Sequence, residues 1–251
     1  MQQEDNGSRG GRFDRDWTKG NIFHNLLSLS WPIVLSSSFN ILGPVIDMVW
    51  VGRLGAASIA GVGIAGMAVM TITSARMGLT MGTRAIIARF VGAGDASGSN
   101  HVAQQAFVIS GTYVIIMASI GAFFAEPIML LFGVEPDVVS EGAAYMRIMF
   151  IGSVTMSFRM MAEGIMQASG DTVTPMRITV GFRLLHALLS PFLVFGLWVF
   201  PHMGVSGAAT ANVIAQGLGG AAGLWILFSA RSRLQLSLKK FSLDPVMIWR
   251  I

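Results

Sequence analysis

The stretch 26-LLSLSWPIVLSSSFNILGPVIDMVW-50 decides the fold, because it runs for 25 residues with one charged side chain, Asp47. An α-helix needs about 20 predominantly apolar residues to cross the hydrocarbon core of a bilayer. The stretch is therefore predicted to be a transmembrane helix. A carboxylate in a bilayer costs about 2.5–3.5 kcal/mol on insertion scales, so Asp47 is a candidate functional residue.

The composition of the whole chain agrees with a membrane protein. Hydrophobic residues make up 53% of the 251 residues and charged residues 12%, whereas soluble domains carry about 25% charged residues. The mean hydropathy is +0.64. The 30 glycines suit closely packed membrane helices. The absence of cysteine excludes disulfides, thiolate metal sites and cysteine nucleophiles.

Long apolar runs recur along the chain and predict six membrane spans. They cover about Leu26–Trp50, Ser58–Ile87, Val102–Phe124, Ala143–Gln167, Ile178–Phe200 and Val205–Ser229. Strands of a transmembrane barrel would be about ten residues long and would alternate apolar and polar positions. These runs are longer and do not alternate, so an all-α membrane protein with six transmembrane helices is expected.

The positions of Lys and Arg predict the orientation in the membrane. Basic residues gather before the first span and after the last one, whereas the link between the third and fourth spans carries only acidic charges, which include Glu126 and Glu141. Cytoplasmic segments are richer in Lys and Arg, so both termini are expected in the cytoplasm. Residues 1–20 are expected to be a polar disordered tail, 21–230 the membrane lobe, and 231–251 a basic linker.

Four stretches, in register, resemble one transporter family. They are VIDMVWVGRLGAASIAGVG (45–63), IARFVGAGD (87–95), MQASGDTVTPM (166–176) and SPFLVFG (190–196) followed by MGVSGAATANVIAQ (203–216). Together they resemble the multidrug and toxic compound extrusion (MATE) transporters. GAGD and SGD also have a local explanation, because Gly and Asp form the turns that reverse the chain between helices.

The resemblance implies a fold and a function. MATE transporters have twelve helices in two lobes, and this chain resembles the N-terminal lobe alone, so it is expected to be a fragment whose second lobe is missing. The implied function is export of organic, often cationic, drugs or metabolites across the cell inner membrane in exchange for H⁺ or Na⁺, without a cofactor. Without the second lobe, a homodimer or a partner chain would be required.

Other functions are weighed against export. The rivals are a lipid-linked oligosaccharide flippase of the same superfamily and a non-transporting membrane scaffold. No phosphate-binding loop of the G-x-x-x-x-G-K-[ST] type occurs, and the basic charges are a topology signal that needs no nucleic acid partner. No enzyme is expected.

The resemblance also implies roles for residues of the first span. Asp47 corresponds to the family's cation-coupling aspartate, and Pro32 to a proline whose kink responds to protonation. The alternative for Asp47 is a hydrated carboxylate at the outer helix end near Arg53. Asn40 lies close to two turns before Asp47, so it shares its face and is expected to line a cavity or to bond a neighbouring helix.

The fifth span departs from the family pattern. Where the bacterial and archaeal branch has Asn and then Asp, this chain has His186 and Ser190. His186 is a candidate coupling group because imidazole titrates near neutral pH, the alternative being a packing role. Ser190 is a candidate cavity residue, although a bond to its own helix backbone is favoured. For Arg183, snorkelling toward the cytoplasmic headgroups is the favoured interpretation.

Glu163 in the fourth span is the other acidic candidate for a cavity residue. Arg159 lies four residues earlier, which is the spacing of an ion pair within one helix. Either a substrate contact or that ion pair explains the glutamate.

Overall fold

The architecture is entirely helical in the residues described by the computed structural model, which are 21–229, 236 and 242–250. The helices are α1 (Ile22–Val51), α2 (Ala56–Thr73), α3 (Ala75–Gly92), α4 (Ala96–Leu131), α5 (Pro136–Ile151), α6 (Ser153–Ala168), α7 (Val173–Phe195), α8 (Gly204–Phe228) and α9 (Pro245–Arg250). The expected tail, 1–20, and about half of the expected linker lie outside the described residues. The all-α membrane fold is confirmed.

Two of the six expected spans are bent helix pairs. Four helices, α1, α4, α7 and α8, are each long and apolar enough to cross a membrane. The second expected span is divided into α2 and α3, which meet at 43°, and the fourth into α5 and α6, which meet at 46°. Counting each pair as one span gives six for the described part of the chain. The hydropathy pattern predicted the six spans, but it did not predict either bend.

The bend between α5 and α6 follows from close packing at Gly152. A Cβ atom built on Gly152 would lie 2.1 Å from a methyl group of Val213 on α8. Only glycine leaves room for that methyl group, so α8 crosses the helix pair where the pair bends. Thr155 then donates its hydroxyl to the Gly152 carbonyl at 2.8 Å, which satisfies an acceptor at the break.

The predicted turns lie where the links reverse the chain. Asp95 accepts a bond from the N–H of Gly98 at 2.8 Å and caps α4. Asp171 accepts a bond from the N–H of Thr174 at 3.0 Å at the start of α7. The expected end of the fifth span at Phe200 is wrong, because α7 ends at Phe195 and the left-handed φ of 65° at the following Gly196 terminates the helix.

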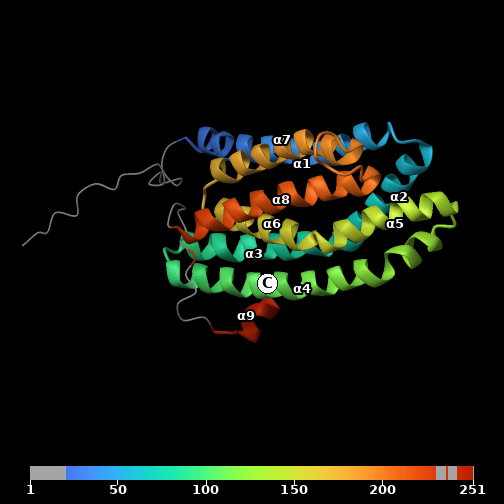
Figure 1. The fold of residues 1–251 in the computed structure, drawn as a ribbon. Helices are drawn as coiled ribbons and strands as arrows, with labels where there is room; N and C mark the ends of the chain where they lie inside the picture. Colours follow the sequence, from blue (N-terminus) through green and yellow to red (C-terminus); the bar gives the residue numbers. More distant parts are fainter. Residues whose placement is uncertain (1–20, 230–235, 237–241, 251) are drawn as a thin grey trace, which may run out of the picture.

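The helices pack in the order seen in Figure 1, and buried polar side chains of α8 form a layer inside the bundle. Helix α7 packs on both α1 and α8, and α8 packs on α6. Along α8, Val205 belongs to one hydrophobic cluster and Leu227 to another. Between them come the buried amides of Asn212 and Gln216. The polar side chains of the interior therefore lie between two apolar clusters.

The first membrane helix begins, and the last one ends, at the same end of the bundle. Figure 1 shows the start of α1 and the end of α8 on the same side, with α9 against α4. Gln105 of α4 binds the segment before α9: its amide donates to the carbonyl of Ser242 at 2.7 Å, and its oxygen accepts from the N–H of Asp244 at 3.2 Å. This arrangement agrees with an even number of spans.

Candidate functional site

Asp47 lies at the junction of three helices, with 1% of its surface exposed. The hydroxyl of Tyr145 on α5 donates to Oδ2 at 3.1 Å. Nε2 of His186 on α7 lies 2.9 Å from Oδ1. The carboxylate is therefore held inside the lobe. It is not paired with Arg53, which stacks on the ring of Trp50 at 5.0 Å.

The spacing of small and polar residues along α1 explains why Asp47 points inward. The buried residues of this helix are Asn25, Pro32, Ser36, Gly43, Asp47 and Val51. They recur at intervals of four and seven residues, which places them on one face of an α-helix. That face meets α7 and α8, while the apolar residues of the opposite face, such as Ile41 and Val45, are exposed.

Arg183 links His186 to α1. Its Nη1 lies 3.4 Å from Nδ1 of His186, and its Nη2 donates to the carbonyl and to Oδ1 of Asn40, both at 3.4 Å. Because a guanidinium can only donate, Nδ1 accepts and the imidazole proton lies on Nε2, where it points at Asp47. The contact depends on Gly43, where a Cβ atom would lie 2.3 Å from Nη1 of Arg183. Snorkelling, the favoured interpretation of Arg183, is wrong.

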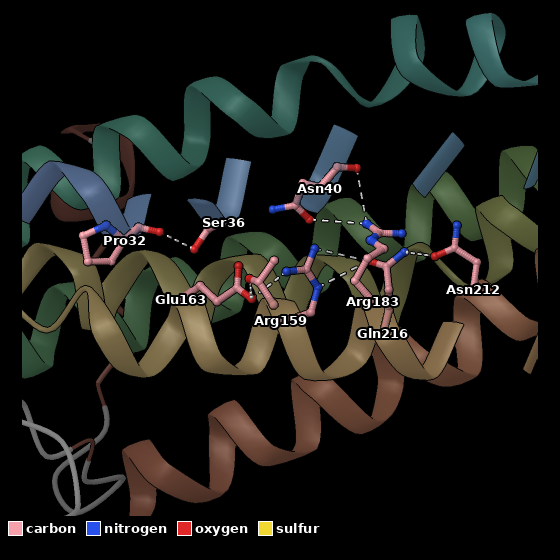
Figure 2. Close-up of polar contacts among 9 residues, drawn as sticks. Pro32, Ser36, Asn40, Arg159, Glu163, Arg183, Asn212 and Gln216 are labelled. Atoms are coloured by element: carbon pink, nitrogen blue, oxygen red, sulfur yellow. Dashed lines mark hydrogen bonds and ion pairs between the residues drawn. The ribbon is translucent and has the colours of Figure 1, made fainter. Parts of the chain in front are cut away.

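A second polar network surrounds Glu163. Nη1 of Arg159 lies 2.6 Å from Oε1 of Glu163, and the hydroxyl of Thr179 donates to the same oxygen at 3.1 Å. Arg159 also donates to Oε1 of Gln216 at 3.3 and 3.4 Å, and Gln216 donates to Asn212 at 2.8 Å. Figure 2 shows Arg159 between Glu163 and Gln216. The ion pair within α6 is therefore present.

Two candidates occupy local positions in their helices. Pro32 lies inside α1, which continues through it, and the hydroxyl of Ser36 donates to the Pro32 carbonyl at 2.8 Å (Figure 2).

Ser190 is fully buried one turn after His186, and its hydroxyl makes no hydrogen bond with the described residues. The expectation that Ser190 bonds its own helix is wrong, which leaves a buried hydroxyl beside the Asp47 site.

Several residues of these networks were not predicted from the sequence. Tyr145, Thr179, Asn212 and Gln216 lack charge, and each lies in a long apolar segment. Gln216 and Asn212 are spaced four residues apart, so a shared face was available as a signal. Nothing in the sequence indicated that Tyr145 faces Asp47, since the two residues are 98 positions apart.

Known proteins resemble this chain over most of its length. The family model MatE matches residues 32–192. A probable multidrug resistance protein, YpnP of Bacillus subtilis, is 27% identical over 204 residues, which are 81% of this chain and 45% of that protein. An FAD transporter of Shewanella oneidensis is 24% identical and is matched over 42% of its length by 76% of this chain.

Solved structures agree with the fold. A MOP superfamily transporter from Pyrococcus furiosus, described as having a binding pocket of reverse polarity that suggests a different function, superposes with a TM-score of 0.85 at 25% identity. The superposition covers 93% of this chain and 51% of that one. An outward-facing MATE family transporter gives a TM-score of 0.77 at 28% identity, over 88% of this chain and 49% of that one.

The chain thus spans about half the length of the relatives that it matches. The family model covers more than half of the chain itself; the matched region begins inside α1, ends inside α7 and includes the buried aspartate. The chain belongs to the MATE family.

Proposed function

We propose that this chain forms one lobe of a membrane exporter in which proton binding at Asp47 drives the outward release of an organic compound. The observation that carries the proposal is the burial of Asp47 between Tyr145 and His186. A buried carboxylate in a membrane helix is a functional hypothesis by default. Here its two oxygens accept bonds from two different helices, α5 and α7.

The geometry favours H⁺ over Na⁺ as the coupling ion. Each oxygen of Asp47 already accepts one protein hydrogen bond, and the residue is almost fully buried, so few lone pairs and little room remain for a sodium ion with its other ligands. A proton can bind Asp47 by replacing a hydrogen bond that the carboxylate accepts. His186 is the neighbour that would take part in this exchange, since its Nε2 lies 2.9 Å from Oδ1 of Asp47.

Protonation of Asp47 would change the contact between α1 and α7. A neutral carboxyl group is a weaker acceptor for the His186 N–H than a carboxylate is. Pro32 and Pro44 lie inside α1, and each removes a backbone hydrogen bond, so this helix bends at low cost. The proton is then coupled to the position of α1, which also carries Asn40.

The arrangement in the cell follows from the same reasoning. We place the lobe in the plasma membrane, which is the inner membrane of a bacterial cell, with both termini in the cytoplasm. Transport requires a second lobe, because the translocation cleft of the family lies between two lobes. That lobe comes from further residues of the native polypeptide or from a second chain.

The test is Asp47→Asn in the native, full-length polypeptide, expressed in cells that lack their own multidrug exporters. We expect loss of energised dye efflux, with protein levels in the membrane unchanged. Asp137→Asn is the matched control, because Asp137 is exposed at the start of α5. Full efflux by Asp47→Asn would refute the coupling role of Asp47.

A further inference from the structure

The described membrane helices bury more arginines than carboxylates. Arginines extend inward from three helices: Arg76 of α3, Arg159 of α6 and Arg183 of α7 have 5%, 2% and 6% of their surface exposed. Arg84 of α3 joins them, with its Nε against Gly164. The buried acids of the described membrane helices are Asp47 and Glu163. Three buried arginines against two buried carboxylates leave these helices with one positive charge in excess, His186 not being counted.

Two of the buried arginines have no acidic partner among the described residues. Arg183 donates to the amide oxygen and the carbonyl of Asn40 and contacts the imidazole of His186, and none of these groups is an acid. Arg76 donates to the hydroxyl of Ser157 at 3.4 Å and to a methionine sulfur at 3.2 Å. Buried charges in proteins are normally paired with an opposite charge, so these cations lack their usual counterpart.

Three arginine Nε atoms are also left without an acceptor. The Nε–H groups of Arg76, Arg84 and Arg183 are buried and make no hydrogen bond to the described protein atoms. An unsatisfied buried donor destabilises a structure by about 1–3 kcal/mol, and more when it is charged. The two buried carboxylates of the membrane helices, Asp47 and Glu163, are already engaged by His186, Tyr145, Arg159 and Thr179.

An aromatic ring positions two of the cations next to each other. The guanidinium carbons of Arg159 and Arg183 lie 4.2 and 4.8 Å from the centroid of the Phe182 ring. Cation–π contacts stabilise each guanidinium but do not neutralise it. Figure 2 shows Arg183 between Asn40 of α1 and Gln216 of α8. The two cations thus lie close together in the polar layer.

We infer that the exported compound carries an anionic group, such as a carboxylate, phosphate or sulfonate, that binds Arg183 together with Arg159 and Arg76. The inference rests on the proposed export function and names its substrate class. It differs from the expectation of often cationic compounds, which the family resemblance implied. A planar guanidinium suits this ligand because its N–H groups match the oxygens of a carboxylate or a phosphate.

The membrane potential also favours an anion leaving the cell. The interior of a cell is negative, and moving one charge across 100 mV is worth about 2.3 kcal/mol. The membrane potential therefore supplies free energy for the export of an anion. Proton binding at Asp47 changes the conformation of α1 and α7.

The test compares an anionic and a cationic dye with the native, full-length polypeptide. Carboxyfluorescein and ethidium are the probes. Their binding to the purified protein is measured by fluorescence anisotropy, and their uptake is measured in energised inside-out vesicles. We expect Arg183→Gln to weaken carboxyfluorescein binding about tenfold or more, to slow its uptake, and to leave the binding of ethidium unaffected or improved. Arg183→Lys should restore part of the binding because it keeps the charge.

Arg177→Gln is the matched control, since Arg177 is an exposed arginine of the same helix. It should leave the binding of both dyes unchanged. Equal losses for both dyes in Arg183→Gln would mean a general structural defect and would overturn the inference. Export of ethidium with no binding of carboxyfluorescein would also overturn it while sustaining the proposed function. Uptake of neither dye would refute the proposed function, and Arg183-dependent carboxyfluorescein binding would still support the anion site.

The anionic group could belong to a soluble compound or to a lipid headgroup. Displacement of bound carboxyfluorescein by dioctanoyl phosphatidic acid and by glycerol phosphate distinguishes them. Stronger displacement by the phosphatidic acid assigns the site to a lipid phosphate, and equal displacement assigns it to a soluble anion. If neither compound displaces carboxyfluorescein, and Arg183→Gln also binds the dye as the native protein does, the inferred anion site is overturned.

Discussion

Gly43→Ala tests whether Arg183 reaches α1 as the structure describes. The new methyl group would lie 2.3 Å from Nη1 and 2.8 Å from Cζ of Arg183, so the guanidinium must move. The movement breaks its two bonds to Asn40. Hydrogen bonds to charged groups contribute about 1.5–3 kcal/mol. Both bonds are long, at 3.4 Å, so we take about 1.5 kcal/mol for the pair.

The substitution also has a favourable effect, because alanine stabilises a helix interior by about 0.5–1 kcal/mol relative to glycine. The net expectation is a destabilisation of about 0.5–1 kcal/mol. Gly181→Ala is the control, since a Cβ atom at Gly181 of α7 meets nothing within 4 Å. It should stabilise the protein by about the helix effect alone. The two Gly→Ala substitutions are thus predicted to have opposite signs.

The assay is equilibrium unfolding of the purified protein in mixtures of mild detergent and SDS. Each variant is measured in the native and in the Arg183→Ala background. The destabilisation by Gly43→Ala should disappear in that background, because contacting residues give non-additive effects. If Gly43→Ala stabilised the protein as Gly181→Ala does, or destabilised it equally in both backgrounds, Arg183 would not lie against Gly43.

Two further predictions concern an ion pair and a helix cap. Glu163→Gln leaves Arg159 buried without its carboxylate, so unfolding should be easier by about 3–5 kcal/mol, whereas the exposed control Glu135→Gln should change little in the same assay. The pKa of Asp244 is lowered mainly because its carboxylate accepts the backbone N–H of Met247. The cap is therefore present above the ordinary carboxyl pKa of about 3.9 and is lost as the pH falls through the lowered value. Hydrogen exchange at the Met247 amide should show protection at neutral pH that Asp244→Ala removes; unchanged protection in that variant would contradict the cap.

Local signals account for most of what was predictable about the fold. A span such as Leu26–Trp50 can be predicted from the sequence because a membrane helix needs about 20 apolar residues in succession. The turn at Asp95 can be predicted from the sequence because aspartate often caps the helix that follows it, as it does here. The break at Gly152 was not predictable, since it depends on the approach of Val213 from α8.

Individual residues of the site were predictable from the sequence, but most of the contacts between them were not. Asp47 and Glu163 were identifiable because a charge in an apolar run is costly. The partner of Glu163 was predictable because Arg159 lies four residues away in the same helix. Tyr145 was missed as the partner of Asp47, and Asn40 as that of Arg183, because these pairs join helices that are distant in the sequence.

The sequence by itself determined that this chain is a six-span helical membrane protein with an acidic residue in its first span, because hydrophobicity and charge act locally along a helix. Only the tertiary structure decided which charges are neutralised. In the folded lobe, Arg183 points inward and donates to Asn40, and its Nε–H has no acceptor among the described residues. The charge of the interior is the sum over side chains from several helices, and that sum exists only after the helices have packed.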